Sequence, residues 1–219
     1  VDLKGVGKKF PTLTILHNAF AEIERGDKIA LIGANGKGKS TLLRIVAGME
    51  NFDGERVWGH NVDESFYAQH QLEALNINNN VLDEMRESRS GKTDLELRSL
   101  LGCFLFSGDD VDKKIKVLSG GEKARVALAK TIVSKANFLM LDEPTNHLDL
   151  ESITAFNNSL KDFKGTLMFT SHDHEFVQTV ANRIIEICPN GFIDKSMSYD
   201  EYITDERVKQ QREALYAKK

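Results

Sequence analysis

Residues 33–40 read GANGKGKS, and this loop decides how the rest of the chain is interpreted. A glycine-rich loop that ends in Lys and Ser binds phosphates because its backbone N–H groups converge on the anion. In such a loop Lys39 reaches the β- and γ-phosphate oxygens, and the Ser40 hydroxyl is available to Mg²⁺. The run alone also fits an ordinary Gly-rich turn. Nucleotide binding is therefore a first hypothesis.

The residues around this loop favour the phosphate-binding interpretation. The pattern predicts a strand over 28–32 and a helix from 39 to about 47, ended by Gly48. A helix N-terminus adds partial positive charge to the N–H groups of the loop. The glycine run thus lies where a fold of this kind holds an anion.

An acidic pair follows a second apolar strand, in residues 137–143 (NFLMLDE). In phosphate-loop enzymes an aspartate at this place, here Asp142, orders the Mg²⁺ shell directly or through water. Glu143 is then placed to orient and polarise an attacking water, since a low dielectric raises its proton affinity. The alternative is an acidic pair that merely ends a strand before Pro144.

Two more polar side chains end predicted strands. His172 follows the strand 166–169 at the edge where ligands collect in open α/β folds, which suggests a γ-phosphate contact. Gln69 closes the strand 65–68, and its amide is suited to Mg²⁺ or to the attacking water. The alternatives are a surface histidine and an exposed glutamine at a strand end.

Strands and helices alternate along most of the chain, which indicates an α/β fold with a mostly parallel sheet. Other strands are predicted over 20–23, 55–57, 138–141 and 184–188. Other helices are predicted over 81–87, 94–101, 121–133, 151–160 and 175–180, with a capping box of Thr93 and Glu96 before the second. The charged tail 204–219 reads as a solvated or partner-dependent helix.

Composition is that of a globular protein, with 41% hydrophobic and 28% charged residues in 219. The longest apolar runs are too short to cross a bilayer, so we expect no membrane insertion.

Cys103 and Cys188 lack metal-ligand spacing, which favours a reducing compartment. We expect the cytoplasm, or an organellar stroma or matrix if a transit peptide has been removed. The net charge of −4 argues against broad binding of nucleic acid, so any RNA contact must be local.

Taken together, these motifs resemble those of an ATP-binding cassette domain over nearly the whole chain. The Walker A, Q-loop, signature, Walker B, D-loop and switch-histidine elements correspond in order to the loop at Gly33, Gln69, LSGGE at Ser119, LMLDEP around Asp142, TNHLD at 145–149 and SHD at His172. Asn146-His147, with Glu122 rather than Gln after the signature glycines, resembles the ABC-F subfamily, many of whose members act on the ribosome.

The resemblance implies a P-loop NTPase cassette fold, with an antiparallel β portion and a helical signature subdomain beside the mostly parallel sheet. The cassette is expected over 1–203, with the helical subdomain at about 75–135 and a charged helix or linker over 204–219. The implied catalytic residues are Glu143, His172 and Gln69, and the implied Mg²⁺ ligands are Ser40, Gln69 and Asp142. The implied ATP contacts are Phe10, Gly33, Ala34, Asn35, Gly36, Lys37, Gly38, Lys39, Ser40, Thr41, Ser119, Gly120 and Gly121.

The family also implies a head-to-tail sandwich, in which the signature serine of one cassette covers ATP held by another. Ser119 and the N–H groups of Gly120 and Gly121 open a predicted helix and so form a second anion site. Each motif occurs once, so the partner is a second cassette of the same parent chain or another copy of this one. Phe10 matches the position that stacks on adenine, and the alternative is a core phenylalanine.

Three features separate this chain from the family pattern or place it in a longer protein. His174 stands where ABC-F members commonly have Arg. The chain opens on Val1, so we expect a fragment of a longer polypeptide. The ending MSYDEY at 197–202, with no long charged linker, favours the second cassette of a pair.

The resemblance therefore implies an Mg²⁺-dependent ATPase whose ATP-driven dimerisation gates ribosome binding. One alternative is the ATPase subunit of an ABC membrane transporter, and another is a binding scaffold with a degenerate site.

Overall fold

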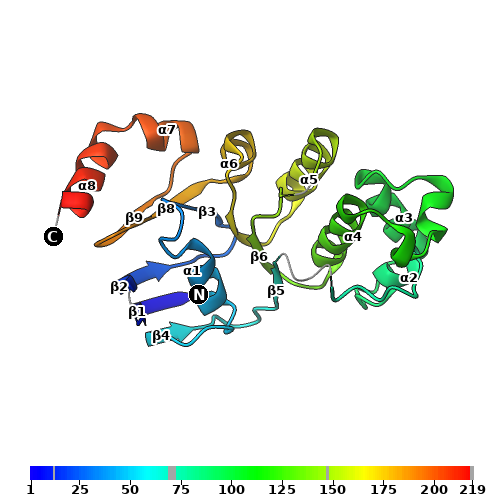
Figure 1. The fold of residues 1–219 in the computed structure, drawn as a ribbon, viewed down its shortest axis with the longest axis horizontal. Helices are drawn as coiled ribbons and strands as arrows, with labels where there is room; N and C mark the ends of the chain where they lie inside the picture. The colour runs from blue at the N-terminus through cyan, green and yellow to red at the C-terminus, as the bar shows by residue number, and fades with distance from the viewer. Residues whose placement is uncertain (12, 69–72, 147, 218–219) are drawn as a thin grey trace.

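The computed structural model describes residues 1–11, 13–68, 73–146 and 148–217 (Figure 1). The strands are β1 (Asp2–Phe10), β2 (Leu13–Glu22), β3 (Lys28–Ile32), β4 (Asp53–Val57), β5 (Glu64–Tyr67), β6 (Phe138–Asp142), β7 (Thr166–Thr170), β8 (Arg183–Cys188) and β9 (Gly191–Lys195). The helices are α1 (Lys39–Val46), α2 (Val81–Arg86), α3 (Asp94–Cys103), α4 (Gly120–Val133), α5 (Leu150–Asp162), α6 (His174–Val180), α7 (Tyr199–Thr204) and α8 (Glu206–Ala217), with 3₁₀ turns η2 (Gly108–Asp112) and η3 (Ile115–Val117).

The larger sheet has the strand order β5-β6-β7-β3-β8-β9 within the described residues. Its neighbours pair in parallel except β8 and β9, which pair antiparallel. The prediction of a mostly parallel α/β sheet is confirmed. Because parallel strands end at one edge, the segments that follow β3, β6 and β7 meet there, although they are far apart in sequence.

A smaller antiparallel sheet has the order β2-β1-β4 in the described part of the chain, which confirms the expected antiparallel portion. Sequence reasoning missed β1, residues 13–19 of β2 and, in the larger sheet, β9. In β1 only Leu3 and Val6 are buried, and two glycines and register shifts interrupt the alternation, so the strand has no clear period of two.

The strands of the larger sheet send alternate side chains into two hydrophobic layers. In β6, Leu139 and Leu141 pack into the layer formed with α4, α5 and α6, whereas Phe138 and Met140 pack into the layer formed with α1, β1 and β2. Figure 1 shows α5 and α6 on one side of the sheet and α1 with the small sheet on the other. Burial on both faces explains why β6 is apolar at every position but its last.

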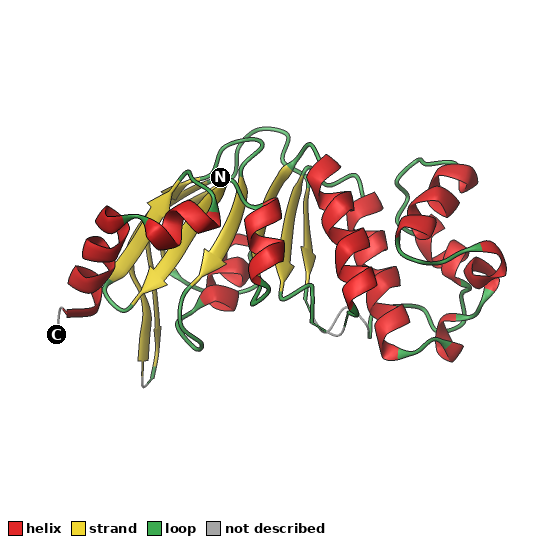
Figure 2. Cartoon of the chain, turned by 90° about the horizontal axis from the view of Figure 1, so that it is seen from above, coloured by secondary structure: helices red, strands yellow, loops and turns green. Residues whose placement is uncertain are grey.

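The helices α2, α3 and α4 lie between β5 and β6 in sequence and gather at one end of the molecule (Figures 1 and 2). The predicted capping box opens α3: the Thr93 backbone N–H donates to Glu96 Oε2 at 2.8 Å, and the Glu96 N–H donates to Thr93 Oγ1 at 3.4 Å. The predicted helical insert is therefore present.

The helices α7 and α8 lie at the opposite end, beside β8 and β9 (Figure 1). The tail was predicted as a solvated or partner-dependent helix, and α8 lies within it with only Val208 of its residues buried. The Nε of Arg212 in this helix donates to the buried Glu186 of β8 at 2.8 Å. The signal for α7 was available in Ser198 and Glu201, which form a capping box.

No helix in the described ranges has the length and apolar character needed to cross a bilayer.

Candidate nucleotide site

The glycine loop connects β3 to α1 in a conformation that requires glycine at two places. Gly33 and Gly38 have φ of 133° and 103°. A Cβ on Gly33 would lie 2.6 Å from the Ile187 carbonyl oxygen, and one on Gly38 would lie 1.9 Å from Cγ2 of Ile15. Positive φ and close packing thus exclude any side chain there.

Lys39 is the first residue of α1 and its side chain is buried within the loop. Its ammonium donates to the Gly33 carbonyl at 2.9 Å and, at 3.4 Å, to the Ala34 carbonyl and to Asn35 Oδ1. These acceptors hold the charge against the loop, next to the first N–H groups of the helix. The loop therefore offers an anion both a cation and free backbone donors.

Three oxygen-bearing side chains meet where β6 and β7 end beside α1. The Ser40 hydroxyl donates to Asp142 Oδ1 at 2.8 Å, and the Thr170 hydroxyl donates to the same oxygen at 2.9 Å. Thr170 also accepts from the Glu143 N–H at 2.8 Å. Sequence reasoning missed Thr170, although it is the polar residue that follows the apolar run 167–169 of β7, in register with Asp142.

Glu143 has a strained backbone and an incompletely satisfied carboxylate. Its φ is 50°, in the left-handed region that non-glycine residues seldom adopt. Its Oε1 lies 3.3 Å from Nε2 of His172, and its buried Oε2 has no hydrogen-bond partner among the described residues. Burial, with the nearby charge of Asp142, raises the pKa of the Glu143 carboxyl, against lowering contributions from His172 and Lys39. Strain and an unpaired buried oxygen mark a functional position.

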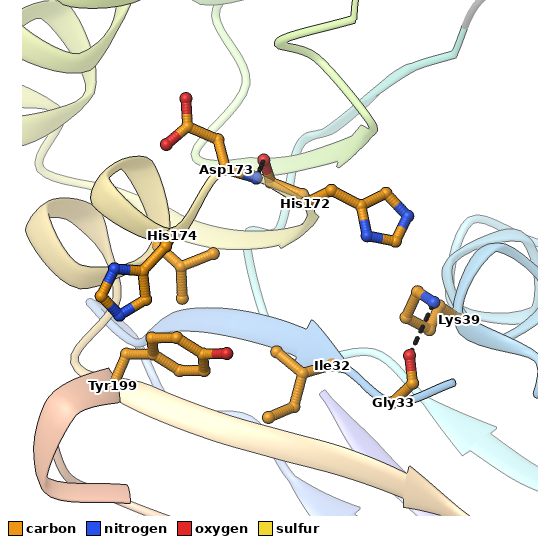
Figure 3. Close-up of a pocket in the computed structure, with 9 residues that line it drawn as sticks. Ile32, Gly33, Lys39, His172, Asp173, His174 and Tyr199 are labelled. Atoms are coloured by element: carbon orange, nitrogen blue, oxygen red, sulfur yellow. Dashed lines mark hydrogen bonds between the residues drawn. The ribbon is translucent and has the colours of Figure 1, made fainter. Parts of the chain in front are cut away.

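A cavity of about 380 Å³ opens over this arrangement. It is lined by Ile15, Asn35, Gly36, Gly38, Lys39, Ser40, Thr41, Glu143 and His172. A second cavity, of about 150 Å³, lies beside it and is shown in Figure 3. It shares Lys39 and His172 with the first and is otherwise lined by Ile32, Gly33, Ser171, Asp173, His174, Val177 and Tyr199.

The structure brings most of the candidate residues together around the larger cavity. Gly33 and Ala34 contact Lys39, and Asp142 contacts Ser40. Lys37 does not line the cavity, and its N–H donates to Ala34 at 3.2 Å. Gln69 falls outside the described residues, as does His147 of the TNHLD run.

Phe10 and the signature residues lie apart from both cavities. Phe10 is 36% exposed, with the Lys8 ammonium 5.0 Å from its ring centre, so the core alternative is wrong. Ser119 caps the N-terminus of α4, accepting from the Glu122 N–H at 3.3 Å, and Gly120 and Gly121 form its first turn. An anion on this cap and one in the glycine loop are different sites within one chain.

The oxygen atoms near Asp142 have the chemistry that Mg²⁺ prefers, because this ion takes hard oxygen ligands. In the described part of the chain no group of three or more His, Cys, Asp or Glu side chains is arranged to hold a metal. A magnesium ion at Ser40 and Asp142 would therefore complete its shell with phosphate oxygens and water, as it usually does.

A phosphate loop and an acidic strand end, set side by side on a mostly parallel sheet, define a P-loop nucleoside triphosphatase. Within that class, the family model described as ABC transporter matches residues 16–146. The chain belongs to the ATP-binding cassette family of ATPases.

Several curated proteins are similar over most of this chain. "Uncharacterized ABC transporter ATP-binding protein YkpA" of Bacillus subtilis is 47% identical over 98% of this chain and 40% of its own length. "ABC transporter F family member 5" of Arabidopsis thaliana is 38% identical over 98% of this chain and 32% of its own. The chain spans two fifths or less of the length of these relatives. The resemblance to ABC-F proteins is confirmed.

Two solved structures share the fold. "RNase-L Inhibitor" aligns with a TM-score of 0.75 and 21% identity over 99% of this chain and 42% of its own. A dimeric post-hydrolysis state of the ATP-binding cassette MJ0796, bound to ADP and Pi, aligns with a TM-score of 0.68 and 20% identity over 90% of this chain and 98% of its own. These likenesses confirm the cassette fold.

Proposed function

We propose that this chain is the Mg²⁺-dependent ATPase cassette of an ABC-F protein, in which ATP-driven closure on a second cassette gates binding to the ribosome. The observation that carries the ATPase part is the placement of Glu143. Its carboxylate lines the cavity above Lys39 and Ser40 and contacts His172, and its buried Oε2 has no hydrogen-bond partner in the part of the chain that the structure describes.

The loop residues are assigned to the nucleotide. Lys39 and the N–H groups of the loop hold the β- and γ-phosphates, and Ser40 with Asp142 holds the magnesium ion, which supplies positive charge to the phosphate oxygens when bound. Thr170 fixes the carboxylate of Asp142 and the backbone of Glu143 at once. Phe10 is assigned to the adenine and, at the end of an exposed hairpin, is accessible to it.

Glu143 is assigned as the general base. Its raised pKa increases its affinity for the proton that leaves water as that water attacks the γ-phosphate. His172 orients the carboxylate from 3.3 Å and faces the same cavity. Gln69 is proposed as a further ligand of Mg²⁺ or water.

The separation of the two anion sites supports closure on a second cassette. Ser119 is exposed and lies in neither cavity that Lys39 lines, so this cassette cannot cover its own nucleotide in the arrangement observed. The helix that Ser119 caps is long enough to offer a full set of N-terminal donors. To invert the open and closed populations, ATP must bind the closed state about 5 kcal/mol more tightly.

The ribosome is proposed as the partner because relatives named as F family members match most of this chain. The same relatives support a cytoplasmic location. We propose that the cassette spans 1–203 with a helical subdomain at about 75–135 and a charged segment at 204–219, and that it is the second cassette of its parent. A transporter subunit, the alternative, would copurify with a membrane protein rather than with ribosomes.

The test uses the full-length protein with Glu143→Gln. We expect ATP binding to be retained, hydrolysis to be lost and the protein to cosediment with ribosomes in Mg²⁺-ATP. Hydrolysis at the parent rate would show that Glu143 is not the base. Retained binding and lost hydrolysis without cosedimentation would leave the ATPase assignment intact and remove the ribosomal one.

A further inference from the structure

The first residue of α6, His174, joins the segment that carries His172 to the C-terminal part of the chain. Nε2 of His174 lies 3.1 Å from Asp200 Oδ1, within hydrogen-bonding distance. The His174 ring meets the Tyr199 ring edge-on, with centroids 4.9 Å apart and planes at 60° (Figure 3). One turn further along α6, Gln178 accepts from the Asp200 N–H at 2.8 Å. Since residues four apart share a helix face, α6 and α7 are joined at two adjacent points.

The helix α7, which carries Asp200, is itself fixed to the larger sheet. Tyr202, in α7, is fully buried, and its hydroxyl donates to Glu186 of β8 at 2.7 Å. The same carboxylate accepts from Arg212 of α8. A buried carboxylate with two donors holds its partners in place, because losing either one leaves a buried charge undersatisfied. The α7 helix therefore provides a rigid anchor for His174.

The segment that carries His172 is the short stretch 171–174, which is held by hydrogen bonds. His172 is the residue of this stretch with the fewest contacts. Ser171 Oγ lies 3.1 Å from Thr145 Oγ1 and accepts from the Asp173 N–H at 3.0 Å. The His172 side chain is 61% exposed, and Glu143 is the polar partner found for it in the described ranges. Its direction thus depends on the backbone between Ser171 and His174.

We propose that His174 is a positioning residue for ATP hydrolysis: its contacts with Asp200 and Tyr199 fasten the segment that carries His172 to the anchored α7 helix, and so hold the His172 imidazole against Glu143. This inference rests on the proposed roles of His172 and Glu143. The C-terminal part of the chain then has a role in the reaction, because α7 fixes His174 and thereby the position of His172 beside Glu143.

The experiment compares His174→Ala, Asp200→Asn, their double variant and His174→Arg in the full-length protein. Because a small misplacement of a catalytic group slows the chemical step, we expect each of the first two to lower kcat roughly tenfold, with the KM for ATP and Tm unchanged. The double variant should be no slower than either single one, since both remove one contact. His174→Arg keeps a donor for Asp200 and should restore kcat, but not when combined with Asp200→Asn.

The matched control is Glu175→Gln, an exposed position of the same helix turn that lines neither cavity, which should keep the parent kcat. Parent-like kcat in His174→Ala, losses that multiply in the double variant, or no rescue by His174→Arg would each overturn the proposal. A shared loss of kcat and Tm would mean a merely structural role and would also overturn it. If Glu143 is not the general base, the Glu143→Gln variant will still hydrolyse ATP. That result distinguishes failure of the proposed function from failure of the inference about His174.

Discussion

The Ser40 hydroxyl donates a 2.8 Å hydrogen bond to Asp142 Oδ1 across 102 positions of sequence. This contact joins the start of α1 to the end of β6, and therefore the phosphate loop to the acidic strand end. It also sets two hard oxygen atoms side by side, one of them on Ser40, which lines the larger cavity. The pair forms the part of the proposed magnesium site that the chain itself supplies.

The first prediction concerns this pair. Asp142→Asn replaces an anionic ligand by a neutral one, so we expect the Mg²⁺ requirement for nucleotide binding to rise by about tenfold or more. The measurement is a magnesium titration of fluorescent ATP binding. Ser40→Ala should raise the requirement less, because water can replace a hydroxyl ligand. An unchanged titration in Asp142→Asn would remove Asp142 from the site.

The second prediction concerns Thr170, which accepts from the Glu143 N–H and donates to Asp142. Thr170→Val keeps the shape but leaves a part-buried N–H without its acceptor, so the free energy of unfolding should fall by about 1–3 kcal/mol. Thr170→Ser keeps the hydroxyl and serves as the control in urea denaturation. Equal stability of the Val and Ser variants would contradict a role for the hydrogen bonds.

The third prediction compares two glycines of the loop. Gly38→Ala should abolish ATP binding and destabilise the fold, because its Cβ would lie 1.9 Å from Ile15 Cγ2 and its φ is 103°. The Cβ of Gly36→Ala would meet no protein atom within 4 Å, so its cost in stability without nucleotide is that of a positive φ, about 1–2 kcal/mol. Thermal unfolding and ATP binding measure both.

The double variant Ile15→Ala with Gly38→Ala removes the obstructing methyl group. It should recover part of the stability lost in Gly38→Ala, and no recovery would mean that backbone strain alone limits the site.

The fourth prediction uses the raised pKa of Glu143. A carboxyl whose pKa is higher in the folded state binds its proton more tightly there, so its contribution to stability is greatest below the unfolded pKa and is lost as pH rises through the folded pKa. Glu143→Gln cannot ionise. Without nucleotide, we expect the variant to be more stable than the parent near neutral pH, with the difference shrinking on acidification. Denaturation from pH 4 to pH 7 tests this, and a pH-independent difference would contradict it.

Much of the site was predictable because short-range patterns determine it. The strand before the loop was predicted with the bounds that β3 has, and the helices α1, α4 and α5 within a few residues. The capping box at Thr93 was also predictable, since its partner lies three residues away and their hydrogen bonds need no tertiary contact. The meeting of the site residues at one edge of the sheet was predictable from the rule that parallel strands end together.

Other features depended on contacts that no local pattern encodes. The strand β1 has a weak alternation and exists because β2 and β4 pair on both sides of it. The contact between His174 and Asp200 joins α6 to α7, and β8 and β9 lie between these two helices in the chain. The contact therefore depends on how the two strands bring the helices together. Burial of Glu186 gave the charged tail an anchor that its composition does not suggest.

The class of chemistry could be inferred from the amino-acid sequence alone, because the glycine loop, Lys39, Ser40 and the acidic pair are short motifs whose residue types carry the function. The alternation of strands and helices could be inferred in the same way, from hydrophobic periodicity. Three features of the site became apparent from the folded arrangement alone: Thr170 bridges Asp142 and Glu143, a buried oxygen of Glu143 has no partner among the described residues, and α7 reaches the segment bearing His172. Each of these depends on desolvation and on distances between remote segments, which arise only when the sheet has assembled.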